Sequence, residues 1–206
     1  AEGRWRRALV AGGFPVSALV LGAGPALPAW AWLLCALPLL LAYPLRTWRD
    51  APFFPTPADA LAGLDQVVQL APGARVLDAG CGLGHGLQAL RRAWPQAQLV
   101  GIEFSRPLAW AARWRCRDAE VQRADMWAAS WAGVDCLYLF QRPESMARAI
   151  AKAEAEMAAG RWFVSLEFEV PGRRATARLG APGARPVWIY RLGGTPPGST
   201  GRPSRR

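Results

Sequence analysis

The chain has 206 residues, of which 52% are hydrophobic and 19% charged, so it can bury the core of one ordinary domain and is not expected to be disordered. Its net charge of +10 comes from 24 Arg and one Lys, Lys152, against 15 acidic residues. Such an excess can serve binding to anionic lipid or nucleic acid, can keep the protein soluble, or can reflect coding bias alone. One histidine, His85, and four scattered cysteines exclude a two-histidine iron site and an HExxH protease, and they argue against a zinc site or a disulfide framework. No metal is therefore expected.

The first 50 residues are predicted to form a membrane anchor. None of the 38 residues from 8 to 45 is charged, whereas one transmembrane helix needs only about 20 apolar residues. A Gly- and Pro-rich turn at 22–28 divides this stretch into two short spans, about 8–23 and 29–45, which indicates a helical hairpin, fully or partly inserted. Flanking arginines place both ends in the cytoplasm, at the inner membrane of a bacterium. A cleaved signal peptide is the alternative.

Beyond residue 50, amphipathic helices alternate with short apolar strands. Because such alternation is typical of parallel sheets, it predicts an α/β, Rossmann-like domain over 51–192 with helices on both faces of the sheet. The stretch 193–206 is expected to be a disordered basic tail. Helices are expected at 58–70, 84–94, 106–117 and 143–158, and strands at 75–78, 98–103, 120–123, 134–140, 161–170 and 186–192.

A glycine-rich loop follows the first strand. Asp78 ends that strand, and glycines then occupy every second position from 80 to 86 before a helix begins. Glycine allows the backbone to turn sharply and to approach a ligand closely. The spacing does not fit the GxGxxG pattern of a dinucleotide site, because the sixth position is His85 or Leu87. It matches [D/E]xGxGxG and so resembles the first motif of class I S-adenosylmethionine-dependent methyltransferases.

Acidic residues at successive strand ends agree with that cofactor, which carries a sulfonium cation and an amino group. Asp78 is expected to attract the cationic end, Glu103 to accept the ribose hydroxyls, and Asp125 with Met126 to contact the adenine. Asp125 could instead cap the next short helix. The full set of expected cofactor-binding residues is Thr56, Asp78, Ala79, Gly80, Cys81, Gly82, Gly84, Glu103, Phe104, Asp125 and Met126.

Three further residue types near the loop have simple structural interpretations. His85 is expected to be a loop residue near the cofactor rather than a proton shuttle, and Cys81 a small side chain that fits a crowded position. Trp110 and Trp114, four residues apart on a predicted helix, are expected to pack in the core rather than to form a substrate cage.

The order of motifs over about 53–192 resembles a narrower family. These are the mitochondrial-type protein-lysine methyltransferases that act on ATP synthase subunit c and on the adenine nucleotide translocase, with their prokaryotic relatives. The resemblance rests on FFPTPADALAGLDQVVQL, GIEFSRPLAWAARWRC, RADMW, DCLYLFQRPESM and PVWIYRL. It implies methylation of a lysine in a membrane or membrane-proximal protein, with Thr56 as a cofactor contact and 138–143 lining the acceptor channel. The chain departs from the family at Gln141 and Arg142.

Methyl transfer to lysine requires the neutral amine but no metal. With a pKa near 10.4, deprotonation at pH 7 costs about 4.6 kcal/mol, and an apolar channel beside a sulfonium would lower that cost. A dedicated strong base is therefore not expected, and Tyr138, Glu144 and Glu167 are candidates for relaying the proton.

The expected partners are a protein substrate with a target lysine and membrane lipid. A lipid or hydrophobic small-molecule acceptor and a non-catalytic cofactor-binding adaptor remain alternatives. Nucleic acid is not expected as a partner, because no NPPY-type motif follows the fourth strand.

Overall fold

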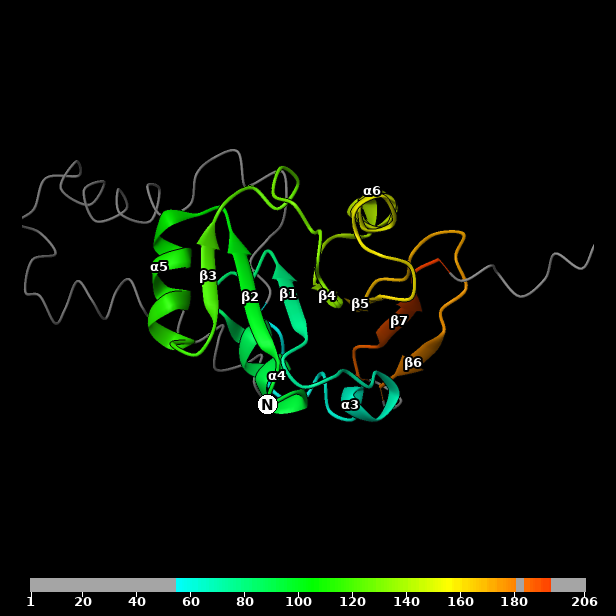
Figure 1. Cartoon of the computed structure of the whole chain (residues 1–206), viewed down its shortest axis with the longest axis horizontal. Coiled ribbons are helices and arrows are strands. Elements are labelled where there is room, and N and C mark those ends of the chain that lie inside the picture. Colours follow the sequence, from blue (N-terminus) through cyan, green and yellow to red (C-terminus); the bar gives the residue numbers. More distant parts are fainter. Residues whose placement is uncertain (1–54, 181–183, 194–206) are drawn as a thin grey trace, which may run out of the picture. The chain divides into compact units, whose positions relative to one another are not determined.

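The computed structural model describes residues 55–180 and 184–193 (Figure 1). The predicted hairpin and the predicted basic tail beyond residue 193 lie outside these residues. In the part of the chain that is described, no helix is both long and apolar enough to cross a membrane.

Seven strands form one mixed sheet in the order β3-β2-β1-β4-β5-β7-β6. Strands β1 to β5 pair in parallel, whereas β7 runs antiparallel to both β5 and β6. The expectation of a wholly parallel sheet was therefore wrong at this edge. The strands are β1 (Arg75–Ala79), β2 (Gln98–Glu103), β3 (Glu120–Arg123), β4 (Cys136–Leu139), β5 (Trp162–Leu166), β6 (Ala177–Leu179) and β7 (Val187–Arg191).

Helices cover both faces of the sheet, as predicted (Figure 1). One core holds α3 (Leu64–Val67), α4 (His85–Ala93) and α5 (Arg106–Arg115), whose apolar side chains pack on alternate residues of the central strands. The other core lies under α6 (Pro143–Glu156) and contains Trp131 and Tyr190. Strand β4 contributes to both cores, because all four of its residues are buried.

Two predicted elements differ from the structure for local reasons. The helix expected at 58–70 is reduced to α3, because Gly63 just before it adopts a left-handed conformation with φ 79° and interrupts the turn. Its apolar positions Leu61, Leu64 and Val68 are nevertheless buried as the pattern required. Strand β6 was not predicted, because its apolar alternation spans only three residues, two of them half-buried and the central one exposed.

The register of the sheet brings the carboxyl ends of its central strands together. Asp78 at the end of β1 lies opposite Gly101 of β2 and Tyr138 of β4. Residues that directly follow these strands therefore meet at one edge of the sheet, which is where open α/β sheets bind their ligands.

Candidate functional site

The loop between β1 and α4 passes closely over the end of β2. The backbone N–H groups of Gly80 and Cys81 both donate to the carbonyl of Ile102, each at 2.9 Å. Gly80, Gly82 and Gly84 have φ values of 90°, 54° and 85°, which side chains other than glycine rarely tolerate. The alternation seen in the sequence thus corresponds to a backbone conformation that only glycine adopts freely.

Asp78 lies beneath this loop with 3% of its surface exposed. Its carboxylate accepts the backbone N–H of Leu87, but Oδ2 has no hydrogen-bond partner among the described residues. Burial, and secondarily the charge of Glu103, raises the pKa of Asp78 from 3.8 to about 8. The site therefore contains a buried carboxyl group whose Oδ2 receives neither a hydrogen bond nor a cation from the described residues.

Glu103 at the end of β2 fastens the loop from the neighbouring strand. Its Oε2 accepts the backbone N–H of Gly82 at 2.9 Å, and its Oε1 accepts that of Ser105 at 2.7 Å. Burial raises the pKa of Glu103, and these N–H bonds partly offset that rise. The role predicted for Glu103, binding ribose hydroxyls, stays a prediction; the role visible here is to hold the glycine loop against β2.

Of the two residues predicted to contact the adenine, Met126 lies at the glycine loop and Asp125 bonds within a turn. Met126 is buried, and its sulfur would lie 3.6 Å from a Cβ placed on Gly80, so it borders the loop. Asp125 is exposed, and its Oδ1 accepts the backbone N–H of Trp127 at 2.8 Å. The alternative weighed for Asp125, that it caps the following turn, therefore describes its present contact.

A buried hydroxyl pair lies on the other side of Asp78. Thr56 Oγ1 and the hydroxyl of Tyr138 are 2.9 Å apart, which joins the start of the described chain to the end of β4. Burial and the charge of Asp78 raise the pKa of Tyr138 above its ordinary value. Tyr138 therefore keeps its proton more firmly than an exposed tyrosine, and its role in relaying a proton stays a prediction.

Two other relay candidates lie at the same edge, beyond β4 and β5. Glu144 is exposed in the first turn of α6. Glu167 directly follows β5 in a left-handed conformation, with φ 73°, and forms an ion pair with Arg185 at 3.1 Å. The guanidinium of Arg185 also lies over the ring of Phe140, 5.4 Å from its centroid. A half-exposed carboxylate, a cation and an aromatic ring thus meet just after β4 and β5.

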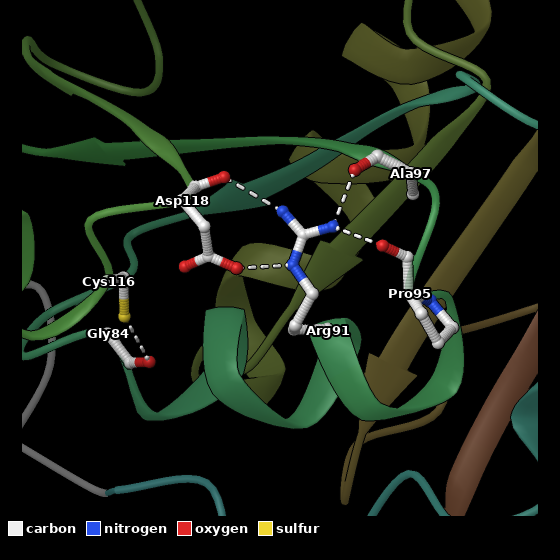
Figure 2. Close-up of polar contacts among 6 residues, drawn as sticks. All are labelled: Gly84, Arg91, Pro95, Ala97, Cys116 and Asp118. Carbon is white, nitrogen blue, oxygen red and sulfur yellow. Dashed lines mark hydrogen bonds and ion pairs between the residues drawn. The ribbon is translucent and has the colours of Figure 1, made fainter.

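Two cysteines and the histidine near the glycine loop make contacts that hold the surrounding elements together. Cys81 is buried with its sulfur 2.8 Å from where a Cβ on Gly101 would lie, so it fills the space that this glycine leaves. Cys116 donates from Sγ to the carbonyl of Gly84 at 3.4 Å, as Figure 2 shows. His85 Nε2 lies 2.7 Å from a guanidinium nitrogen of Arg115, and burial, followed by that charge, lowers its pKa. His85 thus begins α4 and contacts α5, and the expectation that it is not a proton shuttle stays a prediction.

Gln141 is a residue of the site whose side-chain direction the sequence did not indicate. Its Nε2 would be 2.6 Å from a Cβ on Gly80, so the amide lies directly over the loop. The family resemblance placed Gln141 within 138–143, the stretch expected to line the acceptor channel, but no local signal gave the direction of its side chain. Nearby, Phe104 follows Glu103 and is 47% exposed.

Comparisons with known proteins agree with this geometry. Residues 78–177 match the family model of the ANTKMT methyltransferase domain. The trans-aconitate 2-methyltransferases of Afipia carboxidovorans and Azoarcus sp. are 39% identical over 67 residues and 37% identical over 73 residues. These segments are 31% and 34% of this chain, and they span only 25% and 28% of the two relatives.

Solved structures share the fold at low sequence identity. An RNA methyltransferase from Salinibacter ruber, in complex with S-adenosyl-L-homocysteine, has a TM-score of 0.62 and 19% identity, covering 70% of this chain and 97% of that one. Mitomycin 7-O-methyltransferase has a TM-score of 0.51 and 14% identity, covering 66% of this chain and 54% of that one. This likeness shows that the described domain has the fold of these methyltransferases, and residues 78–177 resemble the ANTKMT methyltransferase domain.

Proposed function

We propose that this protein methylates a lysine side chain of a membrane or membrane-proximal protein, using S-adenosylmethionine. One observation carries the choice of donor: the unpartnered buried Oδ2 of Asp78 beneath a loop of left-handed glycines. The choice of acceptor is supported by the match of residues 78–177 to the ANTKMT methyltransferase domain. The membrane setting is supported by the uncharged stretch from 8 to 45.

The residues present fit the proposed cofactor. Asp78 would hold its cationic end, because a positive charge would stabilise the ionised carboxylate that burial now disfavours. The space that a Cβ on Gly80 would occupy is taken by the amide of Gln141, and Met126 borders it with an apolar side chain. When bound, S-adenosylmethionine supplies a methyl group activated by a positively charged sulfur. The task of the protein is then to align acceptor and methyl group and to exclude water.

The arrangement around Arg185 supports a cationic acceptor. Its guanidinium lies between the Glu167 carboxylate and the face of Phe140. Carboxylates and aromatic faces attract either cation, so a lysine ammonium that displaced the Arg185 guanidinium would find the same two partners. The Arg185 and Glu167 side chains are 42% and 36% exposed, so an incoming chain can reach them. Glu167 would position the ammonium and take part in its loss of a proton.

Membranes provide the most direct test of this proposal. The full chain is expressed in its membrane, and washed membranes are incubated with S-adenosylmethionine labelled in the methyl group. Label is expected in a protein band as methyl-lysine, and is expected to be absent with Asp78→Asn. Label found only in the organic extract would contradict the lysine acceptor and favour a lipid. Cofactor binding without any label would instead indicate a non-catalytic adaptor.

A second acceptor class follows from the curated relatives. Their name, trans-aconitate 2-methyltransferase, indicates a small carboxylic acid as acceptor, although the shared segment is about a quarter of their length. The same assay with trans-aconitate added distinguishes the classes. Labelled methyl ester formed at a rate above that of protein labelling would favour the small acid over lysine.

A further inference from the structure

Two tryptophans are exposed on one helix of the domain. Within the described ranges, the large hydrophobic side chains with exposed surfaces are Phe104, Trp110 and Trp114, at 47%, 70% and 68%. The last two are one turn apart on α5, so their indoles occupy the same face. The expectation that this pair packs in the core was wrong. Exposed aromatic surface of this size is a common sign of an interaction site.

The helix is buried by its small residues. Ala109 and Ala112 have no exposed surface and lie against the sheet, while the tryptophans point outward. This orientation follows from the position of α5 beside β2 and β3 at the edge of the sheet, where it packs closely (Figure 1). Alanines permit that close approach, and the indoles contribute little to the core. Their presence on the outer face therefore needs another reason.

Cations surround the two indoles. Arg106, Arg113 and Arg117 are exposed on or just beyond α5, and the helix contains no acidic residue. Arg106 is the first residue of the helix, where the helix dipole disfavours a positive charge. The arginine there does not serve helix stability. The outer face of α5 therefore has two aromatic side chains at its centre and arginines at its border.

We propose that this face of α5, with Trp110, Trp114, Arg106 and Arg117, docks on the surface of an anionic lipid bilayer. Indoles settle at the level of lipid head groups, and nearby arginines are attracted by anionic lipids. A second copy of the chain fits less well, because a symmetric contact would oppose arginines to arginines. A nucleic acid fits less well too, because single strands are bound in grooves, whereas a helix face is convex.

A probe on the helix face tests docking separately from any attachment by the rest of the chain. The full chain carries Cys35→Ser and Pro107→Cys, and position 107 is labelled with an environment-sensitive nitrobenzoxadiazole dye. The cysteines of the described domain are buried, so they are not expected to label. A matched chain carries the dye at Arg174→Cys, an exposed position outside α5. Vesicles contain phosphatidylcholine alone or with 30% phosphatidylserine, and flotation confirms that both proteins bind.

We expect a blue shift, and quenching by brominated lipid, at position 107 but not at 174, and only with phosphatidylserine. Trp110→Ala with Trp114→Ala should abolish both signals. Removing a surface arginine should weaken docking about fivefold, so Arg106→Gln with Arg117→Gln should weaken it roughly 25-fold, while Arg174→Gln should not.

Three results would overturn the proposal. One is protein that floats with the vesicles while its dye at position 107 keeps the emission of a water-exposed dye. Another is a blue shift caused by single-stranded oligonucleotide without vesicles. The third is a tryptophan-dependent dimer without lipid. None of these readouts depends on methyl transfer, so failure here would leave the proposed activity untouched.

Discussion

Asp78 combines full burial with a carboxylate oxygen that no described residue satisfies, and both features disfavour its charged form. Its pKa is near 3.8 when exposed and about 8 in the folded domain. Between these pH values the folded state holds a proton that the unfolded state lacks. The free energy of unfolding therefore falls as pH rises from about 4 to about 8, and the loss is complete above that range.

Asp78→Asn removes this penalty, because the amide cannot ionise. The variant should exceed the wild type in free energy of unfolding at pH 9, by on the order of a few kcal/mol, and the difference should shrink toward pH 4. Urea unfolding of both full chains in mild detergent at pH 4, 6 and 9 measures it. A difference that does not change with pH would show that Asp78 is already ionised in the folded protein.

Binding of a cationic donor should release the proton of Asp78. Below pH 8 the affinity should rise with pH by up to about tenfold per unit, and it should level off above. Calorimetry at pH 7 in two buffers of different ionisation enthalpy should report nearly one proton released per donor bound. Binding with no proton exchanged at pH 7 would contradict this linkage.

Gly86 leaves room for the Asp78 side chain. A Cβ at this position would lie 2.9 Å from the Tyr138 ring and would also overlap the Asp78 carboxylate. Gly86→Ala does not strain the backbone, so its effect is steric, with an expected destabilisation of about 1–3 kcal/mol. The melting temperature should drop and donor affinity should fall. Gly133→Ala, where nothing lies within 4 Å but φ is 73°, controls for backbone strain alone.

At the scale of elements, Arg91 at the end of α4 joins three segments (Figure 2). Its Nε donates to Asp118 Oδ2 at 2.5 Å, and its other nitrogens donate to the carbonyls of Asp118, Pro95 and Ala97 at 2.8–2.9 Å. Because Asp118 is 60% exposed, the ion pair itself contributes little. The hydrogen bonds from the planar guanidinium to three carbonyls contribute the larger part of the stabilisation.

Arg91→Lys should therefore destabilise the domain although the charge is kept. A single ammonium cannot reach all the acceptors, so we expect a loss of about 1–2 kcal/mol in unfolding free energy. Arg92→Lys, at the next position, is the matched control, since among the described residues Arg92 bonds to a single carbonyl, that of Ala58. Equal stability of the two lysine variants would mean that the network contributes no more than a single surface hydrogen bond.

The elements that the sequence predicted well are those with a strong local signal. Strands β2 and β3 have the predicted bounds, and the proline in the first turn marked the start of α6. Strand β6 and the reversed direction of β7 depend on pairing between distant segments, which no local pattern encodes. The Trp110–Trp114 spacing is the same on a buried and an exposed face, so it could not tell core from surface.

The sequence predicted those site residues that lie at or directly after the ends of the parallel strands. Asp78, Glu103 and Met126 do gather around the glycine loop, as their positions after successive strands implied. Gln141 over the loop and the contact of Glu167 with Arg185 arise from side-chain directions, which the sequence does not specify. The predicted cofactor contacts stay predictions, as does the division of the chain at residues 50 and 192.

At the scale of the whole molecule, a domain with a methyltransferase fold carries two proposed membrane contacts, the apolar segment over 8–45 and the α5 face. The central claim is that the domain binds a cationic methyl donor through Asp78. The decisive measurement is a titration of the full chain with S-adenosylmethionine, comparing wild type, Asp78→Asn and the surface control Asp65→Asn. Saturable binding by wild type and control, lost in an Asp78→Asn chain that is at least as stable, is the predicted result. A folded wild-type chain that does not bind the donor, or an Asp78→Asn chain that binds it equally well, would contradict the account.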